Sequence, residues 1–126
     1  MNEARHIQGK HGENLVAEHL TKNGFTVKDR NYHSPYGEID LVATKDNLFT
    51  FVEVKLRNKT YLPLSDIVNN TKQRKIVKTA HHYIATYNIQ NALFRFDVAL
   101  LSSQNNQYAL TYIPHAFSPT DEESYL

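Results

Sequence analysis

The 126-residue chain contains no cysteine. This absence excludes disulfide bonds, thiolate-bound zinc and cysteine nucleophiles, and it is compatible with the reducing cytoplasm, where we expect the protein to be located. The chain also lacks any apolar stretch near the roughly 20 residues that span a membrane, and no apolar run follows its first residues. We therefore expect no secretory signal and no membrane partner.

Several motifs that mark common enzyme classes are missing as well. No glycine-rich phosphate loop is present, which argues against nucleotide hydrolysis. The chain has neither the H-E-x-x-H zinc motif nor the G-x-S-x-G elbow of serine hydrolases. The neighbours His81 and His82 point to different faces of a helix and do not chelate one ion easily. Candidates for chemistry must therefore be sought among the acidic and basic side chains.

The length and the 40% hydrophobic content predict one globular domain over residues 1–117, followed by an acidic flexible tail over residues 118–126. The tail holds three acids and no base, so residues 1–117 carry 14 basic and 10 acidic side chains. Seven of these bases, but one acid, fall between residues 55 and 78. This basic segment suits a polyanionic partner, although a solvated helix and loop would give the same pattern.

The hydrophobic periodicity predicts two helices and five strands. The helices are expected over residues 8–23 and 65–87, the second with Ser65 as its N-cap. The strands are expected, in chain order, over residues 25–30, 38–44, 48–55, 93–101 and 108–113, with a turn region at 31–36 and a loop at 58–64. Short connections make the first three strands antiparallel neighbours, and the second helix can cross over to a parallel strand. The expected fold class is therefore α/β, a mixed sheet flanked by helices.

Two predicted strands place acidic residues face to face. The segments at residues 37–40 and 51–55 alternate apolar and polar side chains, and residues 46–47 (Asp-Asn) form a natural tight turn between them. Symmetric pairing about this turn puts Asp40 opposite Glu53, with their Cβ atoms roughly 5 Å apart. Opposed like charges destabilise a sheet, and a bound cation would remove that cost. Mg2+ suits these hard oxygen ligands.

The same register puts Glu38 opposite Lys55, on the face that also holds Glu53. Lys55 has two interpretations. It can be a surface charge partner of either glutamate, which contributes little. Alternatively, it can be an amine beside the metal that orients or deprotonates an attacking water, or that stabilises the phosphorane as an ammonium.

Three further residues have both a structural and a functional interpretation. Glu13 lies in line with an apolar helical stripe, where it can either sit near the helix start, favoured by the dipole, or assist a carboxylate cluster. Gln73 begins the stripe of the second helix, and Lys72 flanks it; either both reach the site or the helix has a solvated basic side. Asp97 is most simply a structural partner of Arg95.

The motifs of this chain occur in the order seen in one bacterial family. They are Gly12-Glu13, Gly24-Phe25, the GEIDLV string at 37–42, the FVEVK string at 51–55 followed by Arg57, Lys72-Gln73-Arg74 and Arg95-Phe96-Asp97-Val98. Through them, residues 9 to about 113 resemble the YraN family of predicted endonuclease-like proteins. That resemblance implies membership of the PD-(D/E)XK nuclease superfamily, with a restriction-endonuclease-like αβββαβ core similar to Holliday junction resolvases. Ile39 stands where that superfamily has proline, and His33 where an arginine is usual.

The resemblance also assigns roles to individual residues. It implies that the catalytic residues are Asp40, Glu53, Lys55, Glu13 and Gln73. It implies that Mg2+ or Mn2+ is held by Asp40, Glu53 and Glu13. The basic residues expected to bind nucleic acid are Arg57, Lys59, Lys72, Arg74, Lys75 and Lys78.

The expected function is metal-dependent hydrolysis of DNA phosphodiester bonds by an endonuclease, with branched recombination or repair intermediates as candidate substrates and DNA favoured over RNA. Cutting a junction needs two symmetric sites, which makes a homodimer a candidate assembly. Two alternatives stay open. One is a nucleic-acid-binding module without turnover, and the other is a protein-interaction adaptor with an idle nuclease site.

Overall fold

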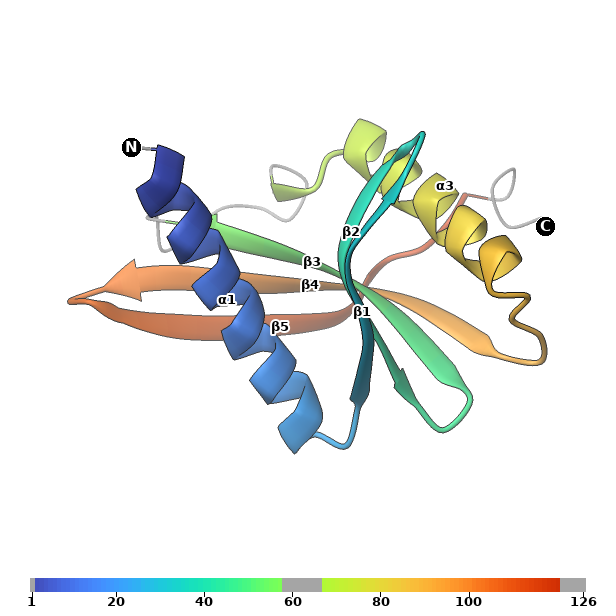
Figure 1. Cartoon of the computed structure of the whole chain (residues 1–126), viewed down its shortest axis with the longest axis horizontal. Coiled ribbons are helices and arrows are strands. Elements are labelled where there is room, and N and C mark those ends of the chain that lie inside the picture. The colour runs from blue at the N-terminus through green and yellow to red at the C-terminus, as the bar shows by residue number, and fades with distance from the viewer. Residues whose placement is uncertain (1, 58–66, 121–126) are drawn as a thin grey trace.

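A computed structural model describes residues 2–57 and 67–120, apart from the side chains of residues 2–8 and 104. This part of the chain forms two helices and five strands in the order that the sequence predicts (Figure 1). They are α1 (Asn2–Lys22), β1 (Thr26–Ser34), β2 (Gly37–Lys45), β3 (Leu48–Arg57), α3 (Asn70–Thr86), β4 (Leu93–Gln104) and β5 (Gln107–Phe117). Neither of these helices is long and apolar enough to cross a membrane.

The five strands form one mixed sheet in the order β1-β2-β3-β4-β5. The pairs β1–β2, β2–β3 and β4–β5 are antiparallel. Strands β3 and β4 are parallel, because α3 carries the chain back across the sheet between them. The α/β class, the antiparallel first three strands and the crossover helix are therefore confirmed.

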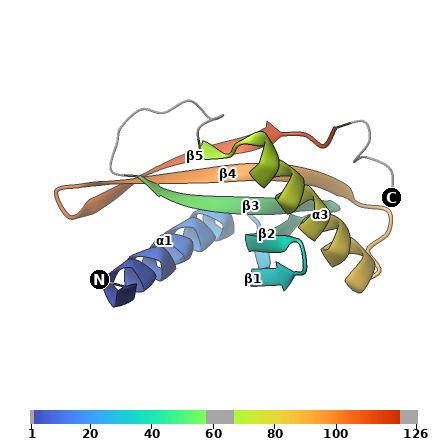
Figure 2. The same ribbon diagram turned by 90° about the horizontal axis from the view of Figure 1, so that it is seen from above.

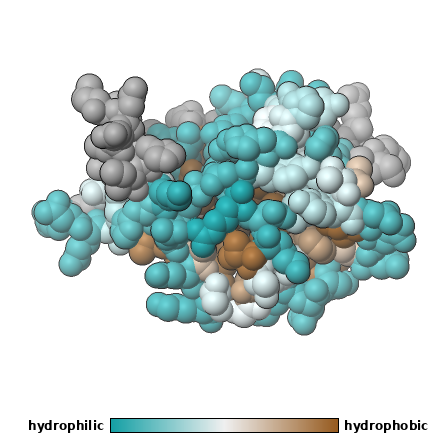
Figure 3. All heavy atoms as spheres, viewed as in Figure 1, coloured by the Kyte–Doolittle hydropathy of each residue, from teal (hydrophilic) through white to brown (hydrophobic). Residues whose placement is uncertain are grey.

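The two helices cover opposite faces of this sheet. Successive residues of β3 show it: Phe51 belongs to the core under α3, whereas Val52 belongs to the core under α1. Strand β4 alternates in the same way. Figure 2 shows α1 lying along one side of strands β3–β5. The face seen in Figure 3 is mostly hydrophilic, with small areas of hydrophobic residues between the hydrophilic ones.

Helix α1 begins earlier than predicted, at Asn2, and ends as predicted before Gly24. Gly24 has a φ of +88°, and its N–H donates to the Thr21 carbonyl while the Phe25 N–H donates to the Leu20 carbonyl. This is a Schellman ending, which needs a left-handed residue and explains the glycine. It directs the chain from α1 straight into β1.

Strand β1 is longer than predicted and includes part of the expected turn region. It continues through residues 31–34, and the chain turns only at Pro35 and Tyr36. Asn31 has a φ of +53° inside the strand, a conformation that asparagine tolerates. Strand β5 likewise extends to Phe117, whose ring stacks on Phe96 at 5.2 Å. Residues 121–126 of the predicted tail lie outside the described residues.

Helix α3 begins later than predicted. Its N-cap is Asn69, which has extended backbone and whose side chain accepts a hydrogen bond from the N–H of Lys72. The predicted cap, Ser65, was therefore wrong for this helix, because a second residue with a capping side chain follows four positions later. Ser65 itself, the predicted loop at 58–64 and Lys59 lie outside the described residues. The later start places Lys72 in the first turn of α3.

The structural interpretation of Asp97 is confirmed. Its carboxylate is fully buried and accepts hydrogen bonds from Nε and Nη2 of Arg95 at 2.8 and 2.9 Å. It also accepts from the Tyr112 hydroxyl at 2.6 Å and from the His115 N–H at 2.9 Å. These donors hold the pKa of Asp97 below its ordinary value, although burial alone would raise it. The network joins β4 to β5.

Candidate functional site

The β2–β3 hairpin has the register that the sequence predicts. Its pairs run from Lys45↔Leu48 to Leu41↔Val52, and Asp46 has the left-handed φ of +54° that the tight turn requires. The next position in this register sets Asp40 against Glu53. There the ladder ends, and the N–H of Val54 donates to Oδ2 of Asp40 at 2.7 Å. The Asp40 carboxylate thus takes the place of a backbone carbonyl as the acceptor for the Val54 N–H, at the point where the two strands separate.

Because the strands separate, the predicted pairing of Glu38 with Lys55 does not form. Glu38 instead pairs with His33 in β1, and its Oε2 lies 3.3 Å from Nδ1 of that histidine. Both side chains are largely exposed. Glu38 is therefore at the edge of the site, while Asp40 and Glu53 form its centre.

Asp40 is unusually basic for an aspartate. Its pKa is raised to about 7, first by burial and then by the neighbouring carboxylate of Glu53, with smaller contributions from Glu13 and Glu38. The Val54 N–H opposes these effects only in part. The cluster thus carries an excess of negative charge, and a bound divalent cation would neutralise it.

Glu53 is buried, with 8% of its surface exposed. Its Oε1 lies 2.7 Å from Nζ of Lys72, which reaches it from the first turn of α3. Burial lowers the pKa of Lys72, but the hydrogen bond and charge of Glu53 more than offset this, and the pKa is raised. Lys72 is therefore held as a cation beside Glu53, and it joins α3 to β3.

Lys55 has the opposite shift. It lies two positions after Glu53 and so on the same face of β3. Burial lowers its pKa first, and the adjacent positive charge of Lys72 lowers it again, while Glu53 raises it only in part. The two neighbouring lysines therefore differ in protonation: Lys72 stays charged, and Lys55 loses its proton more readily than an ordinary lysine.

Glu13 approaches the cluster from α1. Its Oε1 accepts a hydrogen bond at 3.1 Å from Nδ2 of Asn31, and its charge contributes to the raised pKa of Asp40. In the β1–β2 register, Asn31 falls between Arg30↔Leu41 and Tyr32↔Ile39, so it lies opposite Asp40. Asn31 is thus a site residue that the sequence analysis missed. The available signal was an asparagine, a residue that tolerates left-handed backbone, inside a β pattern.

Gln73 is not joined to the carboxylates. Its Nε2 donates to the Val68 carbonyl at 2.9 Å, just before the helix begins. No hydrogen bond to Asp40 or Glu53 is formed by Gln73 within the described residues. This side chain braces the start of α3, next to Lys72, and its predicted catalytic role stays a prediction.

The donor set fits Mg2+ through two carboxylates. Mg2+ is commonly held by one or two protein carboxylates, with water and substrate phosphate completing its octahedron. Asp40 and Glu53 supply such a pair at the end of the hairpin where the two strands separate. Within residues 2–57 and 67–120, no group of three or more histidines and carboxylates is close enough to hold a metal. Glu13, the third predicted ligand, is engaged by Asn31 rather than placed with the pair.

The predicted nucleic-acid-binding residues are spread over two elements. Arg57 is partly buried at the end of β3, and Arg74, Lys75 and Lys78 are exposed along α3. Lys59 lies outside the described residues. Among the described ones, Lys72 contacts the carboxylate pair directly, through Glu53.

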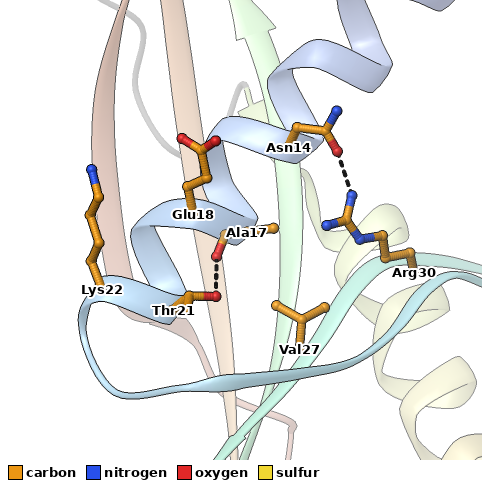
Figure 4. A pocket seen from close by; sticks show the side chains of 7 residues that line it. All are labelled: Asn14, Ala17, Glu18, Thr21, Lys22, Val27 and Arg30. Carbon is orange, nitrogen blue, oxygen red and sulfur yellow. Dashed lines mark hydrogen bonds between the residues drawn. The ribbon is translucent and has the colours of Figure 1, made fainter.

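A separate hollow of about 450 Å³ lies between α1 and β1. Figure 4 shows its lining, in which Arg30 donates to Asn14 at 2.5 Å and Thr21 donates to the Ala17 carbonyl at 2.9 Å. The hollow does not contain the carboxylate pair. The hollow therefore belongs to a different part of the surface from the candidate site.

Comparison with known proteins agrees with the resemblance found in the sequence. The model of "Uncharacterised protein family UPF0102" matches residues 12–101. A UPF0102 protein of Clostridium acetobutylicum is 41% identical over 112 residues, which cover 86% of this chain and 92% of that protein. A UPF0102 protein of Myxococcus xanthus is 36% identical over 114 residues, covering 90% of each chain. This chain therefore belongs to the UPF0102 family, the family identified above as YraN.

Proposed function

We propose that the protein is a Mg2+-dependent endonuclease that hydrolyses DNA phosphodiester bonds. One observation carries this proposal: Asp40 and Glu53 are opposed at the end of the hairpin, with the readily deprotonated Lys55 on the same face of β3. The α1-β1-β2-β3-α3-β4 order also agrees with the restriction-endonuclease-like core that the resemblance implies. Nuclease folds of that kind place a carboxylate pair and a lysine at this strand position.

Asp40 and Glu53 would hold the cation, with the carbonyl of Val54 as a further candidate donor. A bound Mg2+ supplies charge neutralisation for the phosphate and makes water a better acid. The cation would also lower the pKa of Asp40, because its positive charge would replace the carboxylate repulsion that now raises it. Asp40 would then serve as an anionic ligand at neutral pH.

Lys55 supplies the proton transfer. In its neutral form, Nζ accepts a proton from the attacking water as the water oxygen bonds to phosphorus and the bond to the leaving oxygen breaks. The leaving oxygen takes a proton from solvent, and Lys55 returns its own proton to solvent before the next turnover. Lys72 remains an ammonium throughout, and it keeps Lys55 acidic while it neutralises part of the charge at Glu53.

The bases around the cluster would hold the sugar–phosphate backbone. Arg57 lies on the β3 side, and Lys75 and Lys78 lie on the α3 side. Contacts of this kind give affinity that falls with salt and carry little base readout. DNA shape would then determine the substrate, which accords with the branched intermediates that the resemblance suggests.

The test is cleavage of labelled linear, nicked, single-stranded and four-way DNAs with Mg2+ or Mn2+, and with EDTA as a blank. Wild-type protein is compared with Glu53→Ala and Lys55→Ala, and with Glu38→Gln as the matched surface control. The proposal predicts metal-dependent cutting by wild type and Glu38→Gln that both site variants lose. Equal cutting by all four proteins would indicate a contaminating nuclease and would contradict the proposal.

A second function is favoured by the Lys72–Glu53 contact. Because a lysine already neutralises part of the carboxylate charge, the same surface can bind nucleic acid without a metal and without turnover. Salt-sensitive DNA binding that is equal in EDTA and Mg2+, unchanged in Asp40→Asn, and accompanied by no cleavage would establish this binding module instead.

A further inference from the structure

A second polar surface lies farther along α3, beyond the Lys72 that bonds Glu53. Tyr36, in the β1–β2 turn, is 52% exposed, and Nζ of Lys78 lies 5.9 Å from the centre of its ring. Together with His81 and His82, these residues line a hollow of about 410 Å³. The proposed cleavage step uses none of the four residues, and the proposed backbone contacts use Lys78 alone among them. We call this hollow the Tyr36 site.

The Tyr36 site is held rigidly by contacts between the turn and α3. The N–H of Tyr36 donates to Oγ of Ser34 at 3.1 Å, and the Ser34 hydroxyl lies 3.0 Å from that of Thr79. A Cβ atom at Gly37 would be in ordinary van der Waals contact with α3, at 3.5 Å from Oγ1 of Thr79 and 3.6 Å from Cβ of Lys75. The turn that carries Tyr36 is thus joined to the middle of α3.

The spacing along α3 relates the Tyr36 site to the carboxylates. Lys72 bonds Glu53 in the first turn, and Lys75 and Lys78 follow at intervals of three residues, which keeps them near one side of the helix. The six residues from Lys72 to Lys78 span about 9 Å. A stacked DNA strand advances about 3.4 Å per nucleotide, so this distance corresponds to roughly two to three nucleotides.

We propose that the Tyr36 site binds an unpaired nucleotide of the same strand whose phosphodiester lies at Asp40 and Glu53. Its base stacks on the Tyr36 ring, and Lys78 contacts its phosphate. Exposed aromatics set among bases are the usual means of holding single strands, because every base has a π-face. A base within a duplex is already stacked and paired. The substrate class is therefore DNA with a single-stranded segment next to the cut, such as a flap or a fork arm.

This inference deepens the proposed function and rests on it for the position of the cut. Binding can nevertheless be measured alone. The chain has no tryptophan, so Tyr36→Trp gives a protein with a single strongly emitting residue at the Tyr36 site. The variant is titrated in EDTA with a single-stranded oligonucleotide, with an abasic strand of equal charge, and with a duplex of equal length. Stacking predicts quenching by the single strand and far less by the other two; no quenching, or equal quenching by the abasic strand, overturns the inference.

Affinity gives an independent measurement. Tyr36→Ala should weaken single-strand binding by about 5- to 150-fold, the range expected for one lost base–aromatic stack, and Tyr36→Phe should retain it. Tyr87→Ala is the matched control, because Tyr87 is equally exposed but lies outside the Tyr36 site. Circular dichroism of each variant establishes that it is folded. Equal binding by folded Tyr36→Ala and wild type would overturn the inference.

The two proposals fail in different ways. Cleavage of fork DNA at the same rate by wild type and Tyr36→Ala, with no quenching of Tyr36→Trp, would leave a nuclease and remove the nucleotide site. Quenching without cleavage of any DNA would support the nucleotide site and contradict the nuclease. Preferential cutting two to three nucleotides from an unpaired base, lost in Tyr36→Ala, would support both.

Discussion

Nζ of Lys72 lies 2.7 Å from Oε1 of Glu53, so the first turn of α3 is joined by an ion pair to the strand that carries the candidate site. The ion pair places one positive charge inside the carboxylate cluster. Burial and the Glu53 carboxylate still raise the pKa of Asp40 to about 7, and burial together with the charge of Lys72 lowers the pKa of Lys55. In the proposed nuclease, the first turn of α3, the end of the β2–β3 hairpin and a bound divalent cation would together form the site that cuts DNA.

Asp40 should oppose folding when no metal is bound. Its folded pKa of about 7 lies above its ordinary value of 3.8, so the folded state binds more protons between these pH values and loses stability as the pH rises through them. Asp40→Asn cannot ionise and should unfold at a higher temperature than wild type at pH 8, by at least about 1 kcal/mol in stability. Mg2+ should raise the Tm of wild type and not that of the variant.

Differential scanning fluorimetry at pH 5 and pH 8, with Mg2+ or EDTA, checks this expectation. Asp46→Asn, an exposed change in the turn that follows the same strand, is the control and should behave as wild type. An Asp40→Asn protein that is less stable than wild type at pH 8 in EDTA would contradict the account of the cluster.

Removing the Lys72 cation should destabilise the protein through Glu53. Lys72→Met leaves a buried carboxylate without its ion pair, and the cost should be about 1–2 kcal/mol, below the value for a fully buried pair because Lys72 is partly exposed. Changing Glu53 to Gln in the same protein should restore most of the loss. Urea denaturation of the four members of this cycle measures the coupling. A double variant no more stable than Lys72→Met would show that the pair contributes little.

The Asp97 network should dominate acid stability. Its lowered pKa means that its contribution is present above the unfolded value near 3.8 and is lost as the pH falls through the folded value. Asp97→Asn should lose about 3–5 kcal/mol at pH 7, since Arg95 is then left unpaired. The variant should also show a flatter dependence of Tm on pH below about pH 5, where the contribution of Asp97 is lost in wild type. A Tm profile parallel to that of wild type, with Asp46→Asn as the exposed control, would contradict this.

DNA affinity should depend on the bases of α3 in a salt-sensitive way. Each of Lys75→Ala and Lys78→Ala should reduce the slope of log affinity against log salt by about 0.7 to 0.9, the value for one lost phosphate contact. Lys22→Ala removes an equal charge from α1 and should leave the slope unchanged. Fluorescence anisotropy between 50 and 200 mM salt measures all three slopes, and equal slopes would remove α3 from the interface.

The sequence predicted the centre of the site because short-range chemistry decides it. A tight turn at residues 46–47 fixes the hairpin register, and the register then sets Asp40 against Glu53. The crossover helix could be predicted for a similar reason, since a helix between two strands favours a parallel pair. The sequence also sufficed to predict the family and the α/β fold class.

The rest depends on tertiary contacts that the sequence pattern does not contain. Asn31 has a residue type that favours turns, yet β1 runs through it, paired with β2 on both sides, and its side chain donates to Glu13 of α1. Gln73 follows Lys72 in sequence, but the backbone at Val68 takes its amide, while Lys72 reaches Glu53. The position at which α3 begins decides whether Lys72 or Gln73 faces the carboxylates. The sequence offers two capping residues, Ser65 and Asn69, which differ by more than one helical turn, and the structure uses Asn69.

The most direct measurement of the central claim is the single-turnover rate of fork-DNA cleavage in Mg2+ by wild type and Lys55→Arg. Arginine keeps the positive charge but does not lose its proton, so the account predicts a fall of about 100-fold or more, together with loss of the rise in rate with pH. Cleavage by Lys55→Arg at the wild-type rate, or by wild type at an equal rate in EDTA, would contradict the claim that Lys55 and a metal held by Asp40 and Glu53 perform the reaction.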